Sequence, residues 1–428
     1  MLKTTLEKLV NVKAGEIVAL LTSCAYFYLL LCSYYIIRPI RNEMVIENGV
    51  ANIQWLLLFA ALVMLAIVPV FGWLTSHFKT RQFLAYCTLF FASNLFIFFL
   101  LFDQNDTHRS IWISRGFYVW VNVFNMFIIS LFWSFMNDVF SQTQSRRLFA
   151  FIAAGGTAGA LTGPLITSLL VEKIGLGYLL LIAAIILSLT IVCINHLSHW
   201  QNPSNVNSKE QTGIQNKSIK GGVFDGIALI LRSPYLLSIC CFIILFALLS
   251  TFLSIQLAET IEHLFSDSAE RTKLFSLADL ATNVLTLLFQ LSFTGKIINK
   301  FGYRTTLMLL PIGLTIGFLL LIFAPILSVM IALSIFYRAG NYAIMKPTRE
   351  MLFTVVSRAE KYKAKNVIDT AVMRSGNVLS AWLYSGIQAL GAGALGIAVI
   401  GSGLGFIWSG VSYWLGNQYR HKTPSADD

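Results

Sequence analysis

The chain has 428 residues, of which 56% are apolar and only 12% are charged, and its mean hydropathy is +0.71. A soluble protein of this size needs a more polar surface, so the composition excludes that class and predicts a protein embedded in a lipid bilayer. The net charge of +11 would suit nucleic-acid binding only in a soluble basic domain, and the sequence contains none. We therefore predict no nucleic-acid partner.

Apolar runs of about 20 residues, the length that crosses hydrocarbon as a helix, recur along the chain. The alternating pattern of an outer-membrane barrel is absent from it. The sequence thus predicts an all-α membrane protein with twelve transmembrane helices in two groups of six. The runs lie near 17–40, 53–74, 83–102, 112–136, 148–171 and 176–197, then near 235–257, 274–298, 305–324, 326–345, 366–390 and 392–416.

A polar stretch without apolar periodicity, residues 199–222, separates the two groups of spans. It is followed by a short amphipathic segment, Phe224–Leu231. This segment fits a helix along the cytoplasmic membrane surface or an ordinary start of the seventh span. We predict an N-terminal six-helix half (1–198), a cytoplasmic linker (199–234) and a C-terminal six-helix half (235–428).

Most of the 31 basic residues fall at the amino terminus, in the even-numbered connections and in the carboxyl tail. Because basic connections stay on the cytoplasmic side, both termini are predicted to be cytoplasmic, in a bacterial inner membrane.

Two connections between predicted spans share a glycine at the first position and an arginine at the tenth: 72–81 and 295–304. They resemble the two copies of the cytoplasmic loop signature of the major facilitator superfamily, although the first copy is degenerate. An ordinary basic turn is the alternative for either copy taken alone. The resemblance implies the major facilitator fold, in which two six-helix pseudo-repeats alternate access to a central substrate site. It assigns a gating role to Gly72, Arg81, Gly295, Asn299, Lys300, Gly302 and Arg304.

An internal repeat agrees with two related halves. Val139–Arg147 resembles Val355–Lys363, with Ser141 aligned on Ser357 and Arg147 on Lys363. In transporters with such repeats, the substrate binds near the membrane midplane where the repeats meet.

Arginines inside the predicted spans indicate the chemistry of the substrate. An arginine at the bilayer centre costs about 2.5 to 3.5 kcal/mol on insertion scales, so one that is kept usually faces a cavity or a partner. Snorkelling to headgroups, a structural pair such as Arg374 with Asp369, and hydrogen bonds between helices remain alternatives. Acidic residues are fewer, so we expect a net positive cavity that binds an anion. Its predicted substrate-binding residues are Arg38, Arg41, Asn122, Asn125, Gln256, Glu259, Arg338, Asn341, Arg349 and Arg374.

Four stretches sharpen the resemblance: 38–44, 117–133, 231–237 and 346–370 are similar to bacterial relatives of the ATP/ADP translocases. The resemblance puts two functional lysines of those exchangers at Arg41 and Arg349. Two functional glutamates fall at about Asn122 and Gln256. Positive charge is retained while acidic charge is lost, so the substrate need not be ATP or ADP.

We therefore expect a secondary active transporter, not an enzyme, that moves a small anion by alternating access, as an antiporter and as a monomer. A nucleotide or nucleotide/phosphate exchanger is the first alternative, and a siderophore or other organic-anion permease is the second. A channel and a sensor that transports nothing are further classes. No motif for ATP hydrolysis or metal binding is present, and the six cysteines lie within predicted spans, so no cofactor or metal is expected.

Overall fold

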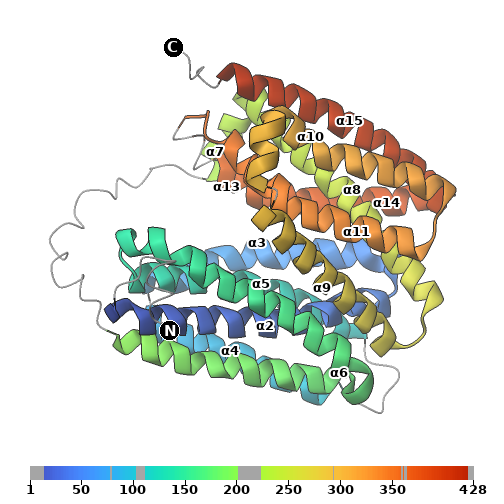
Figure 1. Ribbon diagram of the computed structural model, residues 1–428. Helices are drawn as coiled ribbons and strands as arrows, with labels where there is room; N and C mark the ends of the chain where they lie inside the picture. Colours follow the sequence, from blue (N-terminus) through green and yellow to red (C-terminus); the bar gives the residue numbers. More distant parts are fainter. Residues whose placement is uncertain are drawn as a thin grey trace. The chain divides into compact units, whose positions relative to one another are not determined.

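The regular structure of the protein is helical throughout the part that is described (Figure 1). Ten helices there are long and apolar enough to cross a membrane, so the chain is a multi-pass membrane protein. The computed structural model describes residues 14–77, 80–102, 111–200, 223–292, 294–357, 360 and 364–422.

The long helices carry the fold, and shorter helices join them. In chain order the long ones are α2 (Ile17–Glu47), α3 (Ile53–His77), α4 (Thr80–Leu101), α5 (Ile111–Val139), α6 (Gln142–His199), α8 (Pro234–Leu264), α9 (Ser268–Ser292), α10 (Thr294–Phe323), α11 (Leu327–Gly340), α14 (Met373–Ala389) and α15 (Ala394–Lys422). The short ones are η1 (Ala14–Glu16), η2 (Val50–Asn52), α7 (Val223–Arg232), α12 (Lys346–Leu352), α13 (Lys365–Val367) and the π-helices η3 (Asn341–Met345) and η5 (Ile368–Val372).

The helix boundaries follow the predicted spans, with two informative differences. The 58-residue α6 covers two predicted spans, and Gly175 breaks its path with φ 76° and ψ 173°. This left-handed backbone favours glycine, which has no Cβ to clash. The predicted span 366–390 falls on η5 and on α14, which has only 17 residues. The total of twelve helices in two repeats stays a prediction.

A separate short helix, α7, precedes Ser233 and Pro234, where the sequence predicted an amphipathic segment. Proline has no backbone N–H and suits the first turn of a helix, so α8 begins at Pro234. Whether α7 lies along the membrane surface stays a prediction. Most of the predicted linker, residues 201–222, lies outside the described residues.

The chain forms two compact units. Unit 1 comprises Met1–Asn48, Leu62–Lys217 and Phe265–Leu280, and unit 2 comprises Gly49–Ala61, Ser218–Leu264 and Ala281–Asp428. The first turns of α9 therefore belong to unit 1, and the first turns of α3 belong to unit 2. The domain boundaries predicted from the sequence stay predictions.

In unit 1, α2 and α6 lie side by side with almost no space between their backbones (Figure 1). A Cβ on Gly155 would lie 2.5 Å from the carbonyl oxygen of Cys24, and one on Gly163 would lie 2.7 Å from that of Cys32. Gly159 packs in the same way against the Tyr28 carbonyl. Only glycine fits at these positions, so the glycine repeat of α6 serves close helix packing.

In unit 2, α10 packs against α15 through glycines of α15. A Cβ on Gly405 would lie 3.1 Å from the Cα of Thr315. Trp408 of α15 is fully buried, and its ring centre lies 5.4 Å from that of Phe242 on α8. α15 thus packs against α10 through a glycine and against α8 through an aromatic side chain.

The starts of two segments that the sequence aligned share a local arrangement. The backbone N–H of Ser141 donates to Oε1 of Gln144 at 2.9 Å, and that of Ser357 donates to Oε2 of Glu360 at 2.9 Å. A serine followed three residues later by Gln or Glu is a capping box, which satisfies backbone donors at a helix start. This supports the alignment of Ser141 with Ser357, while Lys363 lies outside the described residues.

Candidate functional site

Arg38 of α2 lies beside a buried carboxylate of α9 in unit 1. Its Nε atom is 3.6 Å from Oδ2 of Asp279, and the two side chains are 12% and 0% exposed. The guanidinium also lies 5.4 Å from the ring centre of Tyr35, one turn earlier on α2. The neighbouring carboxylate stabilises the buried charge of this arginine.

Arg41 lies one turn beyond Arg38, and its recorded contacts are with neutral groups. Its Nη2 donates to Oδ1 of Asn42 at 2.9 Å, and its guanidinium lies 5.9 Å from the ring centre of Tyr118 on α5. Its Nε is buried and has no hydrogen-bond partner among the described residues. A donor of this kind can bind an anion at little reorganisation cost.

The two predicted asparagines of α5 differ in their contacts. The amide nitrogen of Asn122 donates to the carbonyl of Tyr118 at 2.8 Å, within its own helix. The amide oxygen of Asn125 is buried and has no partner among the described residues. Arg41 thus meets the ring of Tyr118, whereas Asn122 meets only the backbone carbonyl of the same residue.

In unit 2, Gln256 and Glu259 lie about one turn apart on α8. Gln256 is 2% exposed, and its amide nitrogen donates to the carbonyl of Ala394 at 3.2 Å, while its amide oxygen is buried without a partner among the described residues. Glu259 accepts hydrogen bonds from the Tyr384 hydroxyl at 2.6 Å and from the Gln388 amide at 2.8 Å. The Glu259 carboxylate thus joins α8 to α14.

Arg338 and Asn341 lie where α11 gives way to the π-helix η3. Arg338 is half-buried in the last turn of α11, and Asn341 is the first residue of η3. Short π-helical segments are rare in proteins, and those that occur often lie at functional sites. A second one, η5, precedes α14, in whose first turn Arg374 is half-buried.

Arg349 of α12 contacts a carboxylate of η5. Its Nη2 lies 3.1 Å from Oδ1 of Asp369, and the side chains are 15% and 30% exposed. Lys365 forms a further ion pair with Glu350. Asp369, considered as a partner for Arg374, is therefore a partner of Arg349, and these pairs connect the segments before and after residues 358–363.

The predicted gating residues fall at helix ends and breaks. Gly302 has φ 76° and ψ 165° and interrupts α10, and Arg304 follows it. The Arg304 Nη1 donates to Oδ1 of Asn417 at 3.2 Å, and its guanidinium lies 4.1 Å from the ring centre of Tyr413, so it joins α10 to α15 in unit 2. Gly72 lies in α3, Arg81 in α4, and Gly295, Asn299 and Lys300 in the first turns of α10.

A buried ion pair of unit 1, between Arg271 of α9 and Glu43 of α2, was not predicted from the sequence. The Arg271 Nη2 lies 2.6 Å from Oε1 of Glu43, and its Nε lies 2.9 Å from Oε2. Glu43 is fully buried, and Arg271 is 13% exposed. An acidic residue inside a span requires a partner, which was the available signal, but the partner's position 228 residues away had none.

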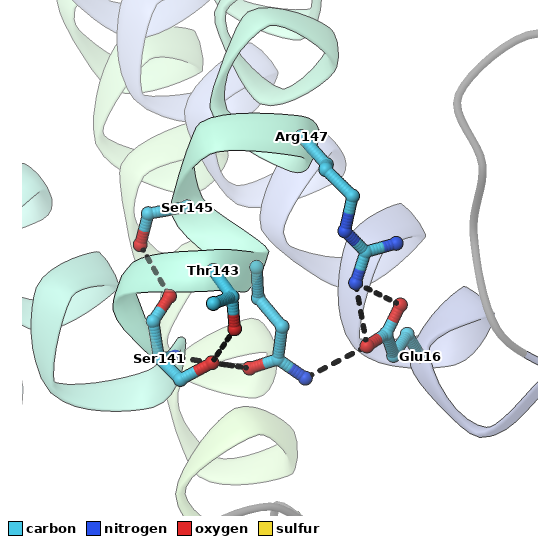
Figure 2. Close-up of polar contacts among 6 residues, drawn as sticks. Glu16, Ser141, Thr143, Ser145 and Arg147 are labelled. Atoms are coloured by element: carbon cyan, nitrogen blue, oxygen red, sulfur yellow. Dashed lines mark hydrogen bonds and ion pairs between the residues drawn. The ribbon is translucent and has the colours of Figure 1, made fainter.

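A second missed cluster joins the starts of α2 and α6 (Figure 2). The Arg147 Nη2 lies 3.1 Å from Oε1 of Glu16, and the same oxygen accepts from the Gln144 amide at 2.8 Å. Glu16 is 5% exposed. Gln144 therefore both caps α6 and fixes the carboxylate at the start of α2. Among the described residues, no group of three His, Cys, Asp or Glu could hold a metal ion.

Comparison with known proteins agrees with this architecture. The chain is 23% identical over 324 residues to ADP,ATP carrier protein 1 of Chlamydia pneumoniae, covering 67% of this chain and 62% of that protein. It is 22% identical over 433 residues to ADP,ATP carrier protein 1 of Chlamydia muridarum, covering 84% of this chain and 80% of that protein. The chain thus spans less than two thirds of the first relative and four fifths of the second.

Solved structures of transporters share the fold. The nucleoside transporter NupG superposes with a TM-score of 0.56 at 13% identity, covering 96% of this chain and 99% of that one. A bacterial homologue of the human lysosomal transporter Spinster gives a TM-score of 0.60 at 14% identity, covering 97% and 100%. The family model described as Major Facilitator Superfamily matches residues 22–361, and the chain therefore belongs to that superfamily of membrane transporters.

Proposed function

We propose that this protein is a secondary active transporter that moves a small anion across the bacterial inner membrane by alternating access. The observation that carries the proposal is Arg41, a partly buried arginine on α2 whose recorded contacts, with Asn42 and Tyr118, are neutral. Keeping such a charge in a membrane helix is costly unless it binds something. A transported phosphate or carboxylate would accept its two parallel N–H donors.

Neighbouring groups support a polar ligand in unit 1. The buried amide oxygen of Asn125 has no partner among the described residues, so it is an acceptor for a hydroxyl or a protonated phosphate of the substrate. The ring of Tyr118 lies beside the Arg41 guanidinium and offers an aromatic face to a flat group. The buried amide oxygen of Gln256 provides a comparable acceptor in unit 2.

A nucleotide or nucleotide/phosphate exchanger is the second candidate. The similarity to ADP,ATP carrier proteins favours it. So do Arg41 and Arg349, which are basic at two positions where the ATP/ADP translocases that this sequence resembles have lysine. Arg349 already contacts Asp369, and Asn122 and Gln256 are amides rather than acids. We therefore leave the substrate class at small anions, with organic anions such as siderophores included.

The test is counterflow in proteoliposomes that contain the purified protein. Vesicles loaded with unlabelled inorganic phosphate, ADP or ATP are diluted into the labelled compound, and initial rates are measured against concentration. Saturable uptake that depends on the internal solute supports an exchanger. Unsaturable flux that does not depend on it supports a channel, and no flux of any probe overturns the proposal for these anions.

The substitution Arg41→Gln tests whether Arg41 binds the transported anion or only stabilises the structure. It should raise the KM by roughly 10 to 100 fold, because one charge-assisted hydrogen bond contributes about 1.5 to 3 kcal/mol. Arg41→Lys keeps the charge and should be milder. Arg115→Gln is the matched control, since the Nε of Arg115 donates to Asn48 at 3.1 Å, whereas the buried Nε of Arg41 has no hydrogen-bond partner among the described residues. An unchanged KM in the Arg41→Gln variant would show that Arg41 does not bind the transported anion.

Orientation is tested separately, since we propose that both termini are cytoplasmic. Single cysteines at Asn105 and Ser208, which lie outside the described residues, should react with an impermeant thiol reagent from opposite sides of the membrane. Asn105 should be reached from outside. Reaction of both from one side would contradict the proposed topology.

A further inference from the structure

Two ion pairs join the first turns of α9 to α2 and α6 in unit 1. Arg271 binds the fully buried Glu43 through two nitrogens, and its Nη1 also donates to the carbonyl of Phe265 at 3.2 Å. Nearer the surface, Lys273 lies 2.7 Å from Glu172 of α6, in a pair whose side chains are 38% and 44% exposed. Arg271 is therefore the fixed anchor of α9 on α2.

The contact between Arg38 and Asp279 is of another kind. Asp279 lies eight residues beyond Arg271, about two helical turns along α9, and its carboxylate is fully buried. The recorded contact is 3.6 Å, which is longer than a hydrogen bond between these atoms. At this separation the two opposite charges still attract each other, and the attraction is strong in a low-dielectric surrounding.

The same arginine lies one helical turn before Arg41, the residue on which the proposed function rests. A mobile anion that reaches Arg41 enters the field of both guanidinium groups. Because a guanidinium offers its planar donors to whichever oxyanion approaches, an incoming phosphate or carboxylate and the Asp279 carboxylate compete for Arg38. A buried carboxylate that loses its cation becomes costly, which destabilises the packing of the helix that bears it.

We infer that Asp279 is a built-in counter-anion, which the transported anion displaces from Arg38, so that substrate binding loosens the hold of α9 on α2. The inference rests on the proposed anion transport. The displacement means that the anion binds one arrangement of α9 more tightly than the other. A ligand shifts a conformational equilibrium only when it binds the two states with different affinity. Ser276 supplies a further contact to be loosened, since its hydroxyl donates to the carbonyl of Pro164 at 2.5 Å.

The first experiment replaces the competitor. Asp279→Asn keeps the shape of the side chain and removes its charge, so purified variant protein should bind ADP and inorganic phosphate about tenfold more tightly, a factor that corresponds to about 1.4 kcal/mol. The maximal counterflow rate should fall, because anion binding no longer alters the contacts of α9. The matched control is Asp267→Asn, which removes an exposed charge from the start of the same helix, where Asp267 accepts from the N–H of Glu270. Its affinity should change less than about twofold.

The second experiment follows α9 in a protein that keeps Asp279. Cysteines at Glu172 and Lys273 replace the exposed ion pair, and the rate of disulfide formation is measured with ADP or phosphate and with potassium chloride at equal ionic strength. Bound anion should slow the cross-link severalfold, and adding Asp279→Asn to the cysteine pair should abolish that effect. A cross-linking rate that ignores bound anion overturns the inference.

The two failures are distinguishable. If the parent protein binds and exchanges none of the probe anions, the proposed function fails and the inference falls with it. If the parent binds ADP or phosphate while Asp279→Asn binds no more tightly, the inference alone is wrong. Tighter binding with an unchanged maximal rate would also overturn it, since Asp279 would then compete without influencing α9.

Discussion

Each unit contains the first turns of a helix that continues in the other unit, and the two cases use different chemistry. The start of α9 in unit 1 meets α2 and α6 through Arg271, Lys273 and Asp279. The start of α3 in unit 2 meets α14 through neutral groups: Ser385 donates to Gln54 at 3.0 Å, and the rings of Trp55 and Trp382 lie 4.8 Å apart at 76°.

Ion pairs and aromatic pairs contribute to a helix contact in different ways. Buried ion pairs contribute little net stability, because desolvation offsets attraction, but removing one partner is costly and fixes the geometry strictly. Edge-to-face aromatic pairs contribute modest stability and carry no net charge. The contacts of α9 should therefore respond to ions and to charge changes, and those of α3 should not.

The largest effect should come from Arg271→Gln. It leaves the buried carboxylate of Glu43 without its main cation, which should lower the free energy of unfolding by about 3 to 5 kcal/mol. The measurement is denaturant or thermal unfolding of the purified protein in one detergent. The double variant Glu43→Gln/Arg271→Gln should recover much of the loss, because two amides can pair. A cost below about 1 kcal/mol would mean that the pair is solvated, and the contrast with unit 2 would disappear.

Trp382→Ala should have an intermediate effect in unit 2. The loss of one edge-to-face pair is expected to cost about 0.5 to 1.5 kcal/mol, and the cost should be the same at low and high salt. Trp382→Phe keeps a ring and should restore most of it. A strong salt dependence would show that charged groups also hold the start of α3.

Lys273→Gln should have the smallest effect. Its ion pair with Glu172 is more than one third exposed, so water and salt screen it, and the loss should stay below about 1 kcal/mol. The small loss should vanish at high salt, whereas that of Arg271→Gln should persist. Equal effects of the two substitutions would show that burial does not set the energetics of this contact.

Local patterns predicted much of the fold. The apolar runs predicted the spans, and the second loop signature contains a true break of the helix, at Gly302. The aligned serines, Ser141 and Ser357, share one capping geometry. Each of these signals is local, because it depends on residues within one or two turns of each other.

The missed features depend on long-range or cooperative effects. Arg271 was not among the predicted site residues, since nothing near it in sequence indicates a contact with Glu43. The ion pair of Asp369 with Arg349, which lies in a different helix, was not predicted. The π-helix at Asn341–Met345 was not predicted, since nothing in the sequence pattern indicated it. The substrate-binding role of the predicted residues stays a prediction, and the pairing of their charges was not predictable from the sequence.

The glycine stripe of α6 has a practical consequence for watching this transporter work. Where backbones touch at Gly155, Gly159 and Gly163, no side chain can yield, so α2 and α6 must travel as one rigid lever. A fluorophore attached at Leu169, a 61% exposed position of α6, would report the displacement of the arginines on α2 without touching them. A label on α6 can therefore follow the motion of α2, where a label beside the arginines would disturb their contacts.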